Sequence, residues 1–190
     1  VYNHIRLMLS QLPAGAPVVR VMPNAPMLVG GAVSALAPGR FATAEHLKEV
    51  SALFDAVGGV LTVDESQLDA VTAVSGSGPA YFFLMVEALV DAAVAAGLPR
   101  SVATDLVTQT MAGSAAMLLE QLDQTESNGS AQMGSMIDTS AAQLRATVTS
   151  PGGTTAAGLR ELERGGLRSA VASAVEAAKR RSEQLGITSE

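Results

Sequence analysis

The sequence contains no cysteine, which excludes disulfides, thiolate catalysis and cysteine-ligated metal centres. Its two histidines, His4 and His46, lie far apart in the sequence, so a metal site built from several histidines is also excluded. Tryptophan is absent and aromatic residues make up only 3% of the chain. Charged residues amount to 16%, and the net charge of −6 argues against nucleic acid or an anionic membrane as a partner.

Two further sequence features, a signal peptide and a membrane-spanning segment, are not expected. The N-terminus does not have the basic-then-apolar layout of a signal peptide. The apolar run 70–86 is shorter than the roughly 20 apolar residues that a spanning helix needs. Gly76, Gly78 and Pro79 also interrupt it. We therefore expect a cytoplasmic protein.

Hydrophobic residues make up 48% of the 190 residues, so this chain buries a core. Its length fits one large domain, or one and a half small ones. Alanine is abundant and is the strongest helix former, so helices should dominate and their backbones should approach one another closely.

The first third of the chain has the pattern of an α/β sheet. Short apolar runs ended by proline or glycine predict strands at 17–22 and 33–37, and the short apolar run after Gly58-Gly59 predicts a third at 60–63. Apolar positions with helical spacing predict a helix over 43–57. Strands that alternate with a helix of this length are typical of the end of an α/β sheet. Residues 1–12 are expected to form a separate helix.

After residue 64 the pattern predicts helices alone. They are expected at 67–74, 79–96, 101–122, 141–147, 155–164 and 167–185. The polar, Gly- and Ser-rich stretch 123–136 predicts a flexible connection or a surface loop. The change in composition near residue 65 therefore predicts two domains, residues 1–64 and residues 65–190.

The loop Ser75-Gly-Ser-Gly-Pro79 precedes a long predicted helix. Unpaired N–H groups and the dipole at a helix N-terminus favour an anion or a cofactor there. It is no dinucleotide fingerprint, because the third glycine of Gly-x-Gly-x-x-Gly would fall on Tyr81. The alternative is a flexible elbow between two helices.

A second loop, Ser150-Pro-Gly-Gly-Thr-Thr155, also precedes a predicted helix. Adjacent glycines leave backbone amides open to a small anion, and the two threonine hydroxyls add polar groups. No lysine follows the glycines, so a phosphate-binding Gly-Lys-Ser/Thr loop is excluded and a carboxylate is the better ligand. The alternative is a plain turn in which Thr154 or Thr155 caps the helix.

A third loop, Arg20-Val-Met-Pro-Asn24-Ala-Pro26, follows a predicted strand. Ligands of α/β sheets bind at the carboxyl ends of the strands, so Asn24 is a candidate to face a cofactor. The alternative is a proline-rich turn after an edge strand.

Taken together, these loops resemble pyrroline-5-carboxylate reductase, the last enzyme of proline biosynthesis. The matching segments are VRVMPN at 19–24, AVSGSGPAY at 73–81, QLRATVTSPGGTTAAGL at 143–159 and LERGGLR at 162–168. The resemblance extends from about Leu12 to Leu185, whereas residues 1–11 match poorly.

The resemblance implies a fold and an assembly. It implies the end of a Rossmann-type α/β domain, followed by an all-helical domain whose helices interleave with those of a second subunit. The family's N-terminal Gly-rich βαβ unit is not found in this sequence. We therefore expect the chain to be part of a longer protein, and to be inactive by itself.

The resemblance also implies site residues. The catalytic residue is Thr155, as a hydroxyl donor beside the ring nitrogen. Substrate-binding residues are Ser150, Gly152, Gly153, Thr154, Thr155 and Asp138, and cofactor-binding residues are Met22, Pro23, Asn24, Ser77, Pro79 and Thr147. Asp138 stands where relatives can have Glu, and Thr147 where they can have Asn.

The implied reaction is the reduction of the cyclic imine 1-pyrroline-5-carboxylate to L-proline by hydride from NADPH or NADH. The implied partners are this small substrate and a second copy of the chain, without nucleic acid, membrane or metal. Two alternatives stay open: a non-catalytic helical dimerisation module, and a related imine or hydroxyacid dehydrogenase.

Overall fold

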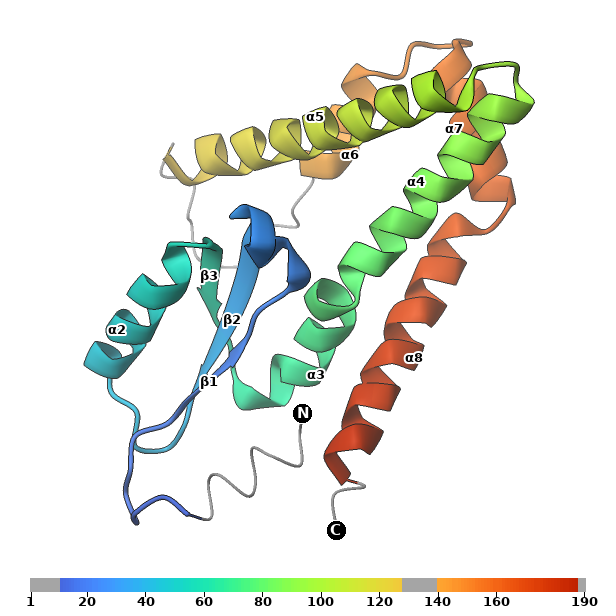
Figure 1. Cartoon of the computed structure of the whole chain (residues 1–190). Helices are drawn as coiled ribbons and strands as arrows, with labels where there is room; N and C mark the ends of the chain where they lie inside the picture. Colours follow the sequence, from blue (N-terminus) through green and yellow to red (C-terminus); the bar gives the residue numbers. More distant parts are fainter. Residues whose placement is uncertain (1–10, 128–139, 188–190) are drawn as a thin grey trace. The chain divides into compact units, whose positions relative to one another are not determined.

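The computed structural model describes residues 11–127 and 140–187, and these residues form two compact units (Figure 1). The sheet unit comprises Val1–Phe82 together with Ser169–Glu190. The helical unit comprises Phe83–Arg168. A domain boundary between residues 64 and 65 stays a prediction.

The sheet has three strands, β1 (Val19–Met22), β2 (Ala32–Pro38) and β3 (Gly58–Thr62), in the order β1-β2-β3. All three predicted strands are present. β2 and β3 are parallel, whereas β1 runs antiparallel to β2 and pairs Met22 with Ala35. β1 therefore runs toward the amino-terminal end of β2, away from the carboxyl ends of the two parallel strands, and ends beside the middle of β2.

Helix α2 (Ala44–Asp55) connects β2 to β3 and begins with a reciprocal cap. The backbone N–H of Thr43 donates to His46 Nδ1 at 3.0 Å, and the N–H of His46 donates to Thr43 Oγ1 at 3.4 Å. Each pair satisfies a backbone donor that the first helical turn leaves free. Gly58 then starts β3 at a φ of +148°, so close to the backbone of Ala32 that a side chain would collide with its carbonyl.

The core of the sheet unit lies on one face of β2. Ala35, Ala37 and Leu68 are almost completely buried, and Met22, Val63 and Val71 pack against them. Ser34 and Leu36 alternate with Ala35 and Ala37 along the strand, so they face the opposite side of the sheet, and both are fully buried.

An irregular helical segment follows the sheet. It consists of the 3-10 helix η2 (Glu65–Gln67), the short helix α3 (Leu68–Val71), the π-helical turn η3 (Thr72–Gly76) and helix α4 (Gly78–Ala95). The regular helix is interrupted where Gly76, Gly78 and Pro79 predict it, since the π-helical turn ends at Gly76 and α4 begins at Gly78. The expectation that the apolar run is too short to span a membrane is wrong. By length and composition alone the helical segment Glu65–Ala95 is long and apolar enough to cross a membrane, and 11% of its most apolar window is buried.

The remaining helices are α5 (Arg100–Ser127), α6 (Ser140–Thr147), α7 (Thr154–Arg164) and α8 (Leu167–Ile187). Each agrees with a predicted helix except at its ends. The prediction of a loop from residue 123 is wrong at its start, because α5 continues through Ser127. Residues 128–136 of that predicted loop and residues 1–10 of the first predicted helix lie outside the described residues.

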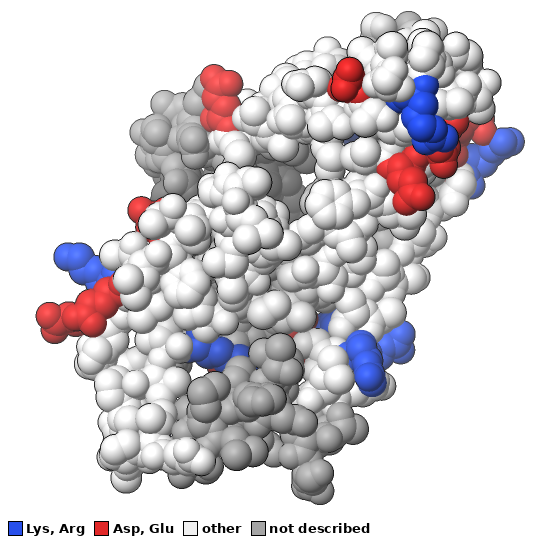
Figure 2. Space-filling view, viewed as in Figure 1, with Lys and Arg blue, Asp and Glu red and all other residues white. Residues whose placement is uncertain are grey.

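The helical unit has little core of its own. Among its described residues, only Val90 and Ala103 are buried hydrophobic side chains. Large apolar side chains lie exposed instead, with exposed fractions of 70% for Phe83, 66% for Leu84 and 63% for Leu119. Charged side chains are sparse over α4 in the space-filling view (Figure 2). A surface of this kind is typical of a protein–protein interface.

Candidate functional site

The loop before α7 forms a tight turn. Pro151 and Gly152 occupy its two central positions, Gly152 has a φ of +70°, and the N–H of Gly153 donates to the carbonyl of Ser150 at 3.1 Å. Proline followed by a residue with positive φ is the pattern of a type II turn, which requires glycine or asparagine at the second central position. Gly152 is therefore dictated by the backbone.

Gly153 is the N-cap of α7, and no side chain caps the helix. The alternative in which Thr154 or Thr155 caps it is therefore wrong. The first backbone bond of the helix runs from the N–H of Ala157 to the carbonyl of Gly153 at 3.1 Å. The N–H groups of Thr154, Thr155 and Ala156 are thus the donors that this helix start leaves free.

Neighbouring backbone donors at the start of a helix are an arrangement to which anions bind in many proteins. The N–H of Gly153 already donates inside the turn, so it is not available to an anion. The free donors therefore begin at Thr154, after the two glycines. A Cβ on Gly153 would collide with Ser150 Oγ, which shows that the Ser150 hydroxyl lies against the turn. The exposed Thr155 side chain is at the second position of the helix. The helix dipole adds a favourable field for a negative charge.

A separate groove lies in the sheet unit. It has a volume of about 510 Å³ and is lined by Met22, Pro23, Asn24, Ala25, Met27, Leu28, Thr72, Gly76 and Ser77. Its lining combines apolar side chains from the end of β1 and from the 3-10 helix η1 (Ala25–Val29) with polar groups from the π-helical turn. An apolar groove with few polar groups is typical of a small-molecule site.

Asn24 connects three segments around this groove. Its Nδ2 donates to the carbonyl of Ser75 at 3.2 Å, and its Oδ1 accepts from the N–H of Val33 at 3.0 Å. The sequence argument placed Asn24 near a ligand because ligands collect at the carboxyl ends of parallel strands. That reason does not hold, since β1 is antiparallel to its neighbour.

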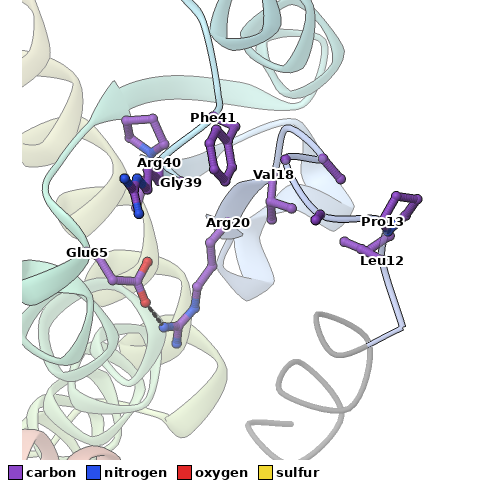
Figure 3. A pocket seen from close by; sticks show the side chains of 13 residues that line it. Leu12, Pro13, Val18, Arg20, Gly39, Arg40, Phe41 and Glu65 are labelled. Carbon is purple, nitrogen blue, oxygen red and sulfur yellow. Dashed lines mark hydrogen bonds and ion pairs between the residues drawn. The ribbon is translucent and has the colours of Figure 1, made fainter.

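A third hollow, of about 660 Å³, lies elsewhere in the sheet unit (Figure 3). Arg20 pairs with Glu65 in its wall, and the guanidinium of Arg40 lies 5.5 Å from the centre of the Phe41 ring. None of the residues predicted to form a site lines it.

The structure gathers the predicted site residues into two groups. Four cofactor candidates, Met22, Pro23, Asn24 and Ser77, line the groove, and Pro79 follows two residues after Ser77 in the first turn of α4. The helical unit holds Ser150, Gly152, Gly153, Thr154 and Thr155 in one turn, and Thr147 at the end of α6. The Thr147 hydroxyl donates to the carbonyl of Leu144 at 2.7 Å. Asp138 lies outside the described residues.

Sequence reasoning missed several members of both groups. Thr72 and Gly76 line the groove because a π-helical turn stands where a short helix and an elbow were predicted. Met27 and Leu28 line it because the proline-rich loop forms η1. Ala156 was missed because the helix was predicted to begin at Thr155, one residue too late.

The fold and the two groups of residues define a class of protein: a small α/β sheet unit with an apolar groove, and a helical unit with a tight turn before α7 and an exposed apolar surface. The family model "Pyrroline-5-carboxylate reductase dimerisation" matches residues 65–185. The chain belongs to the pyrroline-5-carboxylate reductase family.

Relatives and solved structures agree with this assignment. A pyrroline-5-carboxylate reductase of Mycobacterium tuberculosis is 71% identical over 182 residues, which cover 95% of this chain and 62% of the relative. One of Corynebacterium melassecola is 47% identical over 91% of this chain and 58% of the relative. The structure of the Coxiella burnetii reductase matches with a TM-score of 0.82, at 36% identity over 95% of this chain and 62% of that one.

A Plasmodium falciparum pyrroline carboxylate reductase with NADP bound matches with a TM-score of 0.76, at 33% identity over 96% of this chain and 67% of that one. The chain thus spans about 62% of the length of the M. tuberculosis relative.

Proposed function

We propose that this chain forms the substrate-binding part, and part of the cofactor site, of an enzyme that reduces 1-pyrroline-5-carboxylate to L-proline with NADPH or NADH. The names of the relatives and the NADP in the Plasmodium structure support the reaction and the cofactor class. The observation that carries the proposal is the uncapped N-terminus of α7 behind the Ser150–Gly153 turn.

This helix start suits the carboxylate of the substrate. The N–H groups of Thr154, Thr155 and Ala156 are free to donate, and hydrogen bonds from backbone N–H to a carboxylate are charge-assisted. The positive end of the α7 dipole adds to the attraction. Holding the carboxylate fixes the imine ring in one place, which lowers the entropic cost of reaching the reactive geometry.

Thr155 is proposed as the proton donor beside the ring nitrogen. Its side chain is exposed at the start of α7 and does not cap the helix, so the hydroxyl is available to a ligand. A hydroxyl positioned at the nitrogen assists proton transfer as the imine becomes an amine. A protonated imine is already electrophilic, so the site needs no metal, histidine or cysteine. Ser150 and Gly152 shape the turn, and a substrate contact by Asp138 belongs to the same proposal.

The groove of the sheet unit fits a nicotinamide ring. Its Met22, Pro23 and Leu28 wall offers apolar surface to a flat ring, and Ser77 and Thr72 offer polar groups at its side. Bound NADPH or NADH would supply the hydride for the C=N carbon. Pro79 and Thr147 are proposed to lie near the cofactor as well.

The assembly is proposed to be an interleaved homodimer in the cytoplasm. The dimerisation model covers the helices that expose Phe83, Leu84 and Leu119, and these helices bury few side chains of their own. A second copy would cover this apolar surface. The same coverage accounts for the apolar character of the segment Glu65–Ala95, without a membrane.

A hybrid enzyme tests the proposal. In this hybrid reductase, the chain replaces the matching 182 residues of the M. tuberculosis relative, so that the rest of that protein is supplied. We expect consumption of NADPH that depends on pyrroline-5-carboxylate, together with the formation of proline. The 190-residue chain alone is expected to bind NADPH only weakly, because its sequence has no Gly-rich strand–turn–helix to hold the pyrophosphate.

Two controls make the outcome decisive. The unmodified relative shows that the assay works, and sedimentation shows that the hybrid reductase is folded and assembled. A folded, dimeric hybrid without imine reduction would refute the proposal and leave a dimerisation module. Micromolar binding of NADPH by the chain alone would refute the expectation about the cofactor site.

A further inference from the structure

In the helical segment Leu68–Ala95, the carbonyl of Ser75 lacks the N–H donor that a regular helix would supply. In a regular α-helix the carbonyl of Ser75 would accept from the N–H of residue 79. Residue 79 is proline, which has no N–H. Around it, the N–H of Ser77 donates to Thr72 at 2.9 Å in the π-helical turn, and the N–H of Ala80 donates to Ser77 at 3.1 Å. Pro79 thus removes the helical donor for Ser75.

Asn24 supplies the donor from another part of the sheet unit. Its Nδ2 lies 3.2 Å from the Ser75 carbonyl oxygen, across 51 residues of sequence. Its Oδ1 is held in turn by the N–H of Val33, 3.0 Å away, so the amide orientation is fixed at both ends. Both hydrogen bonds are partly buried, where an unsatisfied carbonyl is costly.

This connection joins the two walls of the groove. One wall contains Met22, at the end of β1, and Asn24, two residues later. The other contains Thr72 and Gly76 of the π-helical turn and Ser77, which follows it. The walls also touch at a second point, since a Cβ on Gly76 would lie 2.8 Å from Met22 Cε. The Asn24–Ser75 bond and the contact of Met22 with Gly76 therefore both hold the turn beside the end of β1.

We propose that Asn24 is a positioning residue of the groove, which acts through the Ser75 carbonyl that Pro79 leaves without a helical donor. The family resemblance predicted that Asn24 binds the cofactor. Both ends of its amide are instead engaged by backbone groups, so its effect reaches a ligand through the π-helical turn and Ser77. That the ligand is a nicotinamide rests on the proposed function.

The test uses Asn24→Asp in the hybrid reductase. Aspartate keeps the size and the oxygen that accepts from Val33, but it turns a second oxygen, without a hydrogen, toward the Ser75 carbonyl. We expect kcat to fall about 10- to 100-fold because a displaced wall misplaces the reacting groups. The matched control is Gln67→Glu, which adds the same charge in the same unit and keeps the oxygen that accepts from the N–H of Asp64 at 2.8 Å. It should leave kcat unchanged.

A second variant restores a hydrogen-bond donor for the Ser75 carbonyl within the helix itself. Pro79→Ala introduces a backbone N–H at residue 79, from which a regular helix would donate to the Ser75 carbonyl. Added to Asn24→Asp, it should recover at least about fivefold of the kcat that Asn24→Asp loses, with Pro79→Ala alone measured as the reference for the double variant. A direct contact between Asn24 and the cofactor predicts no such recovery. A loss of melting temperature with unchanged kcat would also overturn the proposal.

Amide hydrogen exchange on the chain separates this proposal from the proposed function. Asn24→Asp should speed exchange of the Ser77 and Ala80 N–H groups about tenfold, and the double variant should restore it. If the hybrid reductase without substitutions is inactive, the proposed function fails. The amide exchange rates of Ser77 and Ala80 then decide the role of Asn24 by themselves. Unchanged exchange in Asn24→Asp would refute that role.

Discussion

Ser182 donates a hydrogen bond of 2.6 Å to Asp69 Oδ1, which joins α8 to α3 across 113 residues of sequence. Ser182 is 4% exposed, so its hydroxyl is removed from water. The bond ties α8 to the sheet unit, to which this helix belongs from Ser169 onward, whereas α7 belongs to the helical unit. The end of α8 is held where the irregular helical segment begins.

Ser182→Ala is expected to destabilise the protein by about 1.5–3 kcal/mol, the range for a hydrogen bond to a charged group. The variant removes the donor and leaves the Asp69 carboxylate with one partner fewer. Urea unfolding at fixed protein concentration measures the change, because a dimer's stability depends on concentration. The matched control is Ser173→Ala, an exposed serine of the same helix, which should change the free energy of unfolding little. Equal effects of the two variants would contradict this prediction.

Local patterns predicted most of the secondary structure. Two strands were found because proline and glycine bound their apolar runs on both sides, and the third because its apolar run follows a pair of glycines. Helices α7 and α8 were found because Gly165 and Gly166 separate two stretches of helical composition. The start of α7 was predicted to within one residue. These signals act within a few residues, so a single sequence contains them.

The remaining features depend on distant partners. The direction of β1 is set by its pairing with β2, and nothing within residues 19–22 encodes it. Pro79 and the glycines around it predict a break, but the π-helical turn that forms there and the hydrogen bond of its Ser75 carbonyl to Asn24 were not predicted, because Asn24 lies 51 residues away in the sequence. Helix α5 continues to Ser127, beyond its predicted end at residue 122. Polar composition alone did not locate this end, because an exposed helix tolerates polar residues.

Ser34→Ala is expected to stabilise the protein by about 1 kcal/mol. Ser34 is fully buried in the middle of β2, and its Oγ has no hydrogen-bond partner among the described residues. Alanine removes the unsatisfied hydroxyl and leaves a void of only one oxygen. The same urea measurement applies, and Ser182→Ala provides a contrast in which an identical change has the opposite sign. A loss of stability in Ser34→Ala would show that the hydroxyl has a partner.

The chain is expected to sediment as a homodimer at low micromolar concentration, with an apolar interface above about 2,000 Å². Phe83→Glu should weaken this assembly, because it places a charge on a side chain that is 70% exposed in the single chain and covered in a dimer. Ser101→Glu adds the same charge at an exposed polar residue and is expected to leave the dimer intact. A native chain that stays folded as a monomer in analytical ultracentrifugation would rule out the obligate dimer.

Thr155→Val in the hybrid reductase is expected to lower kcat more than it raises KM. The variant keeps the shape of the side chain and removes the hydroxyl proposed to stand beside the imine nitrogen. Loss of a positioned proton-transfer group typically costs about 10²–10⁴-fold, less where water takes its place.

The stability of this variant tells the two roles of Thr155 apart. Because Gly153 is the N-cap and no side chain caps α7, Thr155→Val should not show the loss of about 1 kcal/mol that removal of a cap produces. Thr155→Ser, which keeps a hydroxyl, should retain most of kcat and serves as the matched control. Melting temperature and kcat are measured on all three proteins. A valine variant with a lower melting temperature and undiminished kcat would remove Thr155 from the mechanism, because its hydroxyl would then serve only the helix.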